Sequence, residues 1–266
     1  NYLDKGLRGL WYPVLASWEV QSAPVGITRL GEQIVVWRNK DGQVQALEDR
    51  CPHRGARLSM GWNLGDRIAC WYHGVEVAGN GEVKDVPAVD RCPLVGQQCV
   101  RSYSVQEAHG AIFLWFGVTA DQQPDELNFP QELADSDKYS NFLCTAAWKC
   151  NYQYALENVM DPMHGTYLHS SSHSMAEGDR KADMVLQPTK TGFIFEKKGQ
   201  VGVNFDWVEL GNSGAYWMRL SIPYKKRFGP GGHFWIVGMV VPEDNDNCRV
   251  FFWRIRGVQG WQRDLW

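Results

Sequence analysis

The sequence lacks the long apolar stretch that a membrane-spanning helix requires. Its longest apolar runs cover residues 111–118 and 235–241, far short of the ~20 residues that cross a bilayer as a helix. The first residues also lack the basic-then-apolar pattern of an export signal, so we expect the protein in the cytoplasm. Basic residues are not in excess, since the formal net charge is −3. A nucleic-acid partner would require a basic surface, and the composition therefore argues against one.

A nucleotide-binding motif is also missing. No G-x-G-x-x-G follows a strand-like run, so we do not expect this chain itself to bind a nicotinamide or flavin cofactor. The seven cysteines are an odd number in a chain of 266 residues, which favours reduced thiols or metal ligands over a disulfide framework. Aromatic residues, by contrast, are abundant, with 13 Trp, 10 Tyr and 11 Phe. They indicate a large β core and are compatible with an apolar cavity for a flat organic ligand.

The chain divides into segments of different composition. Residues 1–118 read as short strands between turns, with a hairpin signal at residues 39–42 and with His109 expected at a strand start. Residues 119–141 are acidic and polar and contain two prolines, which indicates a linker or surface crossing. Residues 142–266 combine one helix with several aromatic-rich strands, typical of a curved antiparallel sheet. We therefore predict an α+β protein with an all-β N-terminal domain.

The helix of the second half is predicted from its spacing. Bulky residues recur at Tyr152, Leu156 and Val159, which places them on one helical face. Pro162 should end or kink this helix near Asp161, because proline lacks the amide proton that continues a helix.

The sharpest motif is CPHRGARLSMGWNLGDRIACWYH at residues 51–73. It gives Cys51-x-His53, then sixteen residues, then Cys70-x-x-His73. Unrelated thiols and imidazoles are one reading, and a structural Cys2His2 zinc site is another. In a zinc finger, however, the cysteines pair together and the histidines pair together. The third reading is a Rieske [2Fe–2S] centre, in which two cysteines hold one iron and two histidines the other, so that the reduction potential rises.

These two stretches, CPHRGARLSMG and CWYHG, resemble the Rieske domains of the bacterial Rieske non-haem iron oxygenases. One departure is Val75, where many members of that family carry tryptophan. The resemblance implies a Rieske domain over residues 1–118 and a catalytic domain with a helix-grip (START-like) fold over residues 142–266. It also implies two cofactors, the [2Fe–2S] cluster and a mononuclear Fe(II).

The stretch ENVMDPMHGTYLH, residues 157–169, is weaker evidence when taken alone. His164 and His169 lie five apart, about 140° around a regular helix, so they do not share one face. Two ordinary histidines are therefore one reading. Binding of a single ion requires the helix to break or widen between them, and Pro162 and Gly165 supply such an irregularity.

The family resemblance gives this stretch a role, because an electron-carrying cluster needs an acceptor. Asn158-x2-Asp161-x2-His164-x4-His169 is similar to the mononuclear iron motif of the same oxygenases. The resemblance assigns His164 and His169 as iron ligands. It makes Asp161 a bridge between a ligating histidine and a Rieske histidine, usually of a neighbouring subunit.

The third iron ligand implied by the resemblance, a carboxylate on a late helix, is missing from this sequence. Asp264 comes too early. We therefore expect the carboxylate beyond Trp266 and a chain that is truncated at its C-terminus. Candidates for the substrate pocket, each with sheet packing as the alternative, are Asn204, Trp207, Trp217 and His233.

Together these features predict the terminal oxygenase component of a Rieske system. It would use O2 and electrons from NAD(P)H, delivered by a separate reductase with or without a ferredoxin, to hydroxylate, dihydroxylate or demethylate a small aromatic or related organic substrate. A homotrimer is expected, because head-to-tail contacts place one subunit's cluster near the next subunit's iron. The alternative is a Rieske-type electron-transfer or regulatory protein whose second domain lacks a complete iron site.

Overall fold

The computed structural model describes residues 5–119, 121–171, 178–200, 205–223 and 232–265. Contacts divide the chain into two units, residues 1–124 with 241–245 and residues 125–240 with 246–266. The division after Pro124 lies inside the predicted crossing segment 119–141. No helix in the described ranges is long and apolar enough to span a bilayer.

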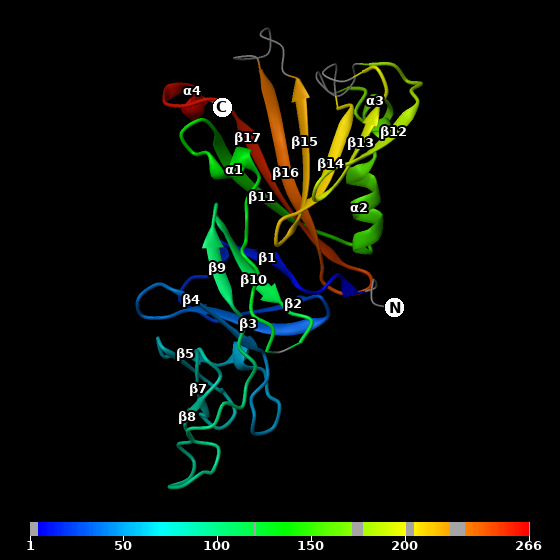
Figure 1. Cartoon of the computed structure of the whole chain (residues 1–266). Helices are drawn as coiled ribbons and strands as arrows, with labels where there is room; N and C mark the ends of the chain where they lie inside the picture. The colour runs from blue at the N-terminus through cyan, green and yellow to red at the C-terminus, as the bar shows by residue number, and fades with distance from the viewer. Residues whose placement is uncertain (1–4, 120, 172–177, 201–204, 224–231, 266) are drawn as a thin grey trace. The chain divides into compact units, whose positions relative to one another are not determined.

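The described part of the first unit consists of three small antiparallel sheets, of strand orders β1-β10-β9, β2-β3-β4 and β5-β6-β7-β8 (Figure 1). The strands are β1 (Leu10–Ala16), β2 (Val25–Arg29), β3 (Glu32–Arg38), β4 (Val44–Glu48), β5 (Trp62–Asn63), β6 (Arg67–Ala69), β7 (Glu76–Ala78), β8 (Val83–Asp85), β9 (Val105–Ala108) and β10 (Ala111–Phe116).

Turn residues explain how these strands connect. The hairpin predicted at residues 39–42 is confirmed, because β3 and β4 pair on either side of it. The prediction that His109 starts a strand is wrong. His109 and Gly110 form the two-residue turn between β9 and β10, with φ of 50° and 78°. A two-residue hairpin favours positive φ at both positions, since that twist matches the flanking strands.

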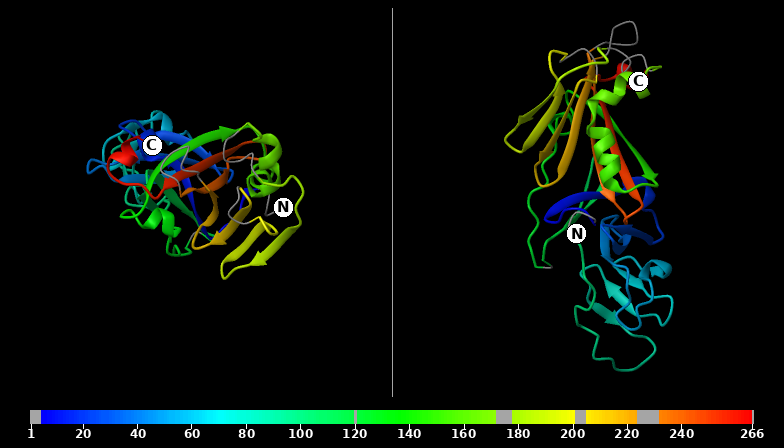
Figure 2. Two further views of the ribbon diagram at one scale, coloured as in Figure 1. Left: turned by 90° about the horizontal axis from the view of Figure 1, so that it is seen from above. Right: turned by 90° about the vertical axis from the view of Figure 1, so that its right-hand side faces the viewer.

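The second unit is built on an antiparallel sheet. Within the described residues this sheet has seven strands in the order β11-β17-β16-β15-β14-β13-β12, and Figure 2 shows that it curves. Its elements are α1 (Gln131–Ala134), β11 (Ser140–Trp148), α2 (Tyr152–Met160), α3 (Gly165–Leu168), β12 (Met184–Pro188), β13 (Gly192–Lys197), β14 (Trp207–Asn212), β15 (Tyr216–Pro223), β16 (His233–Pro242), β17 (Cys248–Arg256) and α4 (Trp261–Leu265).

Helix α2 covers one face of this sheet and contacts β14 and β17 (Figure 1). We call this the inner face. Side chains alternate along a strand, so every second residue of a strand points toward the helix. The apolar cluster on the inner face includes Val159 and Met160 of α2 and Phe205, which precedes β14. Its sheet members are Val208, Leu210, Met218, Leu220, Ile222, Phe234, Ile236 and Phe252.

Candidate functional site

Two loops of the first unit carry the predicted cluster ligands, and they share one backbone arrangement. In the first loop, the amide of Gly55 donates to the carbonyl of Cys51 at 2.9 Å. In the second loop, which follows β6, the amide of Gly74 donates to the carbonyl of Cys70, also at 2.9 Å. The two glycines have φ of 70° and 71°, a region that a residue with a Cβ enters only at a cost. The geometry thus accounts for a glycine four residues after each cysteine.

The four predicted ligands come together with the thiols inside and the imidazoles outside. Cys51 and Cys70 are 2% and 1% exposed, whereas His53 is exposed and His73 is half-buried. The two imidazole ring centroids lie 4.8 Å apart. Each loop therefore supplies one inner sulfur and one outer nitrogen donor.

Two opposing electrostatic effects act on the Cys51 thiol. Burial raises the pKa of Cys51 to about 11, and the neighbouring Cys70 thiol adds to this effect, while the backbone N–H groups of His53 and Arg54 act in the opposite direction. Those two N–H groups point at the sulfur, so they would stabilise a thiolate. Because a ligating cysteine must lose its proton, binding of iron would overcome the raised pKa.

The donor set fits a two-iron cluster. Among the residues that the structure describes, no group of three or more His, Cys, Asp or Glu side chains could hold one ion. A single zinc ion would need all four of these donors around one point. A Rieske cluster instead requires two cysteines for one iron and two histidines for the other, as the two loops provide.

The second predicted site begins where α2 ends. Asn151 caps the start of α2 by accepting a hydrogen bond from the amide of Gln153 at 2.9 Å. The helix ends at Met160, and Asp161 accepts a hydrogen bond from the amide of Met163 at 2.7 Å. This prediction of a helix end near Asp161 is confirmed.

A break in the helix precedes the first of the two histidines. A 3₁₀ turn runs over Pro162–His164, and the short helix α3 (Gly165–Leu168) follows it. The predicted irregularity thus lies mainly before His164; between the two histidines the chain changes from the 3₁₀ turn to the α-helical residues Gly165–Leu168. The ring centroids of His164 and His169 are 5.2 Å apart, close enough for both rings to face one ion.

The side chain of His164 is 13% exposed. Its Nδ1 is buried and has no hydrogen-bond partner among the described residues. Oδ2 of Asp161 lies 3.9 Å from Nδ1, and the ring of Phe205 lies edge-on to the imidazole, with 5.6 Å between ring centroids. A buried polar atom without a partner is costly; donation from Nδ1 to Asp161, which a small shift would allow, leaves Nε2 of the same ring to bind a metal ion.

The other predicted residues of this stretch are placed as follows. Asn158 is exposed on the last turn of α2, and its carbonyl accepts from the amide of Asp161 at 3.3 Å. Asp264 lies on α4, where it pairs with Arg263 at 2.9 Å. In the described ranges no carboxylate joins His164 and His169 in a three-ligand group.

The predicted substrate-pocket residues do not gather around His164. Trp207 and Trp217 alternate with the inner-face residues of their strands and so point to the opposite face. Arg219 lies over the ring of Trp207, 5.6 Å from its centroid, and Trp217 packs against Trp253 at 5.7 Å. His233 contacts Trp235 at 5.8 Å on that same opposite face. Asn204 lies outside the described residues.

Sequence reasoning missed one polar residue on the inner face. Lys197, the last residue of β13, is 1% exposed. Phe193 and Phe195 precede it at intervals of two residues, so a lysine interrupts an otherwise apolar face. That interruption was the available signal in the sequence.

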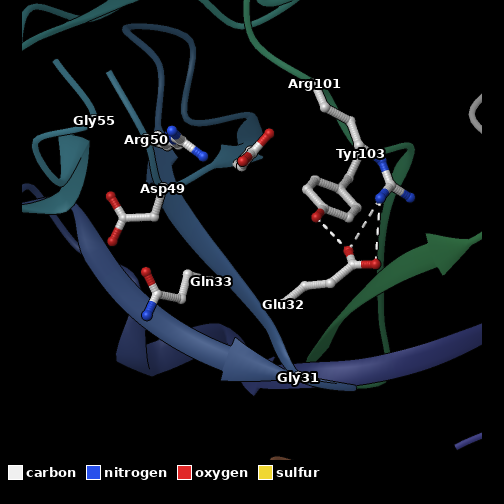
Figure 3. A pocket seen from close by; sticks show the side chains of 9 residues that line it. Gly31, Glu32, Gln33, Asp49, Arg50, Gly55, Arg101 and Tyr103 are labelled. Atoms are coloured by element: carbon white, nitrogen blue, oxygen red, sulfur yellow. Dashed lines mark hydrogen bonds and ion pairs between the residues drawn. The ribbon is translucent and has the colours of Figure 1, made fainter. Parts of the chain in front are cut away.

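A separate polar pocket of about 540 Å³ lies in the first unit (Figure 3). Gly55 of the first cluster loop contributes to its lining. Glu32 accepts hydrogen bonds there from Tyr103 at 2.5 Å and from Arg101 at 3.2 Å. Burial alone would raise the pKa of Glu32, but hydrogen bonds from Tyr103 and Arg8 and the arginine charges outweigh it, and the pKa is lowered.

Two protein-family models match the chain, one in its first half and one in its second. Residues 10–104 match the Rieske [2Fe-2S] domain, and residues 148–266 match the vanillate O-demethylase oxygenase C-terminal domain. The vanillate O-demethylase oxygenase subunit of a Pseudomonas species is 33% identical over 172 residues, which cover 65% of this chain and 48% of that protein. The terminal oxygenase component of carbazole 1,9a-dioxygenase from Metapseudomonas resinovorans is 32% identical, over 81% of this chain and 55% of its own length.

A solved structure shares the fold. The oxygenase in a complex of the oxygenase and ferredoxin of carbazole 1,9a-dioxygenase superposes with a TM-score of 0.75 at 24% identity, over 98% of this chain and 75% of that one. The chain spans about half the length of the curated relatives it matches.

Proposed function

The chain belongs to the Rieske non-haem iron oxygenases, and we propose that it acts as the terminal oxygenase component of such a system. The observation that carries the proposal is the proximity of His164 and His169 at the two ends of the short helix α3, with 5.2 Å between their ring centroids. The same chain carries two loops that hold two buried thiols and two outer imidazoles. An electron-storing centre and an iron site in one chain are what an O2-dependent oxidation requires.

The chain's own residues would hold both groups. Cys51 and Cys70 would ligate the inner iron of the cluster, and His53 and His73 the outer one. When bound, the cluster supplies single electrons and the mononuclear iron, with two histidines and one carboxylate, leaves positions open for O2.

Asp161 would serve the site in two ways. Its Oδ1 fixes the turn that carries His164, through the hydrogen bond from the amide of Met163 at 2.7 Å. Its Oδ2, 3.9 Å from Nδ1 of His164, lies on the side of the ring from which a carboxylate orients a ligating imidazole. We propose that Asp161 connects this imidazole to a Rieske histidine of a neighbouring subunit in a homotrimer, and that Asn158 supports it from one helical turn away.

Substrate and partners follow from the same proposal. The substrate is a small aromatic or related organic molecule, bound against the apolar inner face and hydroxylated, dihydroxylated or demethylated. The names of two relatives contain vanillate and carbazole, which are both small aromatic molecules. A separate reductase, with or without a ferredoxin, would deliver electrons from NAD(P)H.

Iron content and a histidine variant test the function. The full-length protein should contain about three iron atoms per chain, two in the cluster and one in the second unit. His164→Ala should lower this to about two, keep the electron paramagnetic resonance signal of the reduced cluster, and abolish oxygenation of an aromatic substrate. His233→Ala is the matched control, because His233 lies on the opposite face, and it should keep the full iron content.

One observation favours a second candidate function. In the described ranges no carboxylate completes the His164–His169 site, as expected for an electron-transfer or regulatory Rieske protein without a working iron site. Iron content of about two per chain in the full-length wild-type protein would establish that alternative and rule out the oxygenase.

A further inference from the structure

Lys197 is a buried cation without a hydrogen-bond partner. The residue is 1% exposed, and its Nζ makes no hydrogen bond within the part of the chain that the structure describes. An ammonium group has three donor protons, and burying a charge without hydrogen bonds is expensive. A ligand that accepts hydrogen bonds from these donors would offset the cost of burying the ammonium group.

The side chain of Lys197 points to the face of the sheet that carries the site. On β13, Phe193 and Phe195 lie opposite Leu210 and Val208 of β14, and these two residues belong to the apolar cluster against α2. By alternation Lys197 points to the same inner face. Strand β13 also contacts the Pro162–His164 turn, and the charge of Asp161 acts on Lys197, so the lysine lies near the iron-site turn.

The surroundings of Lys197 explain how its charge is tolerated. The backbone amide of Lys197 donates to the carbonyl of Asp206 at 2.8 Å, so the two residues face each other across the strand pair. Burial lowers the pKa of Lys197, and the negative charges of Asp206 and Asp161 oppose this effect. Neither carboxylate accepts a hydrogen bond from Nζ. The two aspartates thus offset the charge but leave the donors unused.

Phe205 connects this group to the predicted iron site. It precedes Asp206 in the chain, is 2% exposed, and its ring lies edge-on to that of His164 at 5.6 Å. An apolar surface for an aromatic ring and a cation with unused donors therefore lie near the turn that carries His164.

We propose that Lys197 is a substrate-recognition residue and that the substrate is an aromatic oxyanion such as a benzoate. The proposal rests on the proposed oxygenase function and adds the charge of its substrate. The ring would pack on the apolar inner face, and the carboxylate would accept charge-assisted hydrogen bonds from Nζ, which are roughly twice as strong as neutral ones. Vanillate is a carboxylate and carbazole is uncharged, so the names of the relatives do not determine the charge of this protein's substrate. The unused donors of Lys197 favour an anionic one.

Ligand binding tests this without turnover. Titration calorimetry on the full-length protein would compare 4-methoxybenzoate with the uncharged 4-methoxybenzamide. Wild type should bind the benzoate about tenfold or more tightly than the amide, and Lys197→Met should remove this preference. Lys197→Arg keeps the charge and should retain part of it. Lys198→Met is the matched control, because Lys198 is exposed and should leave both affinities unchanged.

Three outcomes would overturn the proposal: equal affinity of wild type for the two probes, binding of neither, or an anion preference that survives in Lys197→Met. A lysine with a purely structural role would lower the melting temperature of Lys197→Met and leave the ratio of affinities as in wild type. If Lys197→Met does not fold, Lys197→Gln and Lys197→Arg carry the comparison. Oxidation of neutral aromatics by wild type and Lys197→Met alike would uphold the oxygenase while rejecting the anion site.

Discussion

At the scale of single residues, two glycines determine how the cluster ligands are presented. Gly55 and Gly74 occupy equivalent positions in the two loops, with φ of 70° and 71°. Each returns its amide to the carbonyl of the cysteine four residues earlier, at 2.9 Å. The loop can therefore turn sharply enough to leave the thiol inside and the imidazole outside.

Replacing either glycine by alanine should weaken cluster retention. Gly55→Ala and Gly74→Ala would each cost about 1–2 kcal/mol, because a Cβ disfavours the left-handed region. The visible absorbance of the cluster per protein should fall, and the cluster should be lost at a lower temperature on heating.

Gly42→Ala provides the control for backbone strain alone. Gly42 has φ of 78° and no atom within 4 Å of an added Cβ. Gly42→Ala should therefore lower the stability of the fold by about as much as Gly55→Ala or Gly74→Ala. Its cluster absorbance should match wild type. Equal loss of cluster in Gly42→Ala would show that the loop glycines have no specific role.

At the scale of elements, Glu32 ties strand β3 to the segment at residues 101–103 (Figure 3). Burial opposes the ionised form of Glu32, but the hydrogen bonds and charges of Tyr103, Arg8 and Arg101 outweigh it and lower the pKa. A carboxyl group whose pKa is lower in the folded state stabilises the fold when ionised. This contribution is complete above the ordinary glutamate pKa of about 4.3 and is lost as the pH falls through the lower folded-state value.

Glu32→Gln should therefore remove a pH-dependent part of the stability. At pH 7 we expect the free energy of unfolding of the first unit to drop by about 1–2 kcal/mol, since the bonds are charge-assisted but partly exposed. Between pH 5 and pH 3, the variant should lose less stability than wild type in denaturant titrations. Asp90→Asn is the control, because it changes an exposed carboxylate; its stability should depend on pH as that of wild type does. If the stability of Glu32→Gln also runs parallel to that of wild type over this pH range, Glu32 does not have this role.

At the scale of the whole molecule, each unit has an apolar cluster of its own. The cluster of the first unit includes Cys51 and Cys70 themselves, packed with Trp37, Leu47 and Ile68. The cluster of the second unit lies between α2 and the inner face of the large sheet. Loss of the Rieske cofactor should therefore affect the packing of the first unit directly and that of the second unit little.

Cys51→Ser should confine its damage to the first unit. The variant loses an iron ligand and a buried apolar contact, so hydrogen exchange should accelerate in β4, β6 and β7 while β14–β17 stay protected. Cys248→Ser is the matched variant in the second unit, because Cys248 is fully buried on β17. Its replacement should accelerate hydrogen exchange in the large sheet and leave the visible absorption spectrum of the cluster unchanged. Loss of protection throughout the chain in Cys51→Ser would contradict this independence.

Much of the candidate site could be predicted from sequence because its determinants are local. Cys51, His53, Cys70 and His73 lie in two short loops whose turns are set by nearby glycines. The helix end at Asp161 follows from Pro162 alone. His109 shows the limit of local reasoning, since its positive φ arises from the pairing of β9 with β10 and not from its own preference.

The sequence alone determined which donor atoms are available and that the helix between Asp161 and His169 breaks, because ligand chemistry and proline geometry depend on neighbours in the chain. Only the tertiary structure decided which face of each strand meets α2. Alternation places Trp207 and Val208 on opposite faces in any sheet, but packing against the helix selects Val208 for the inner one. The same selection buries Lys197 on the side of His164 and places Trp217 on the other.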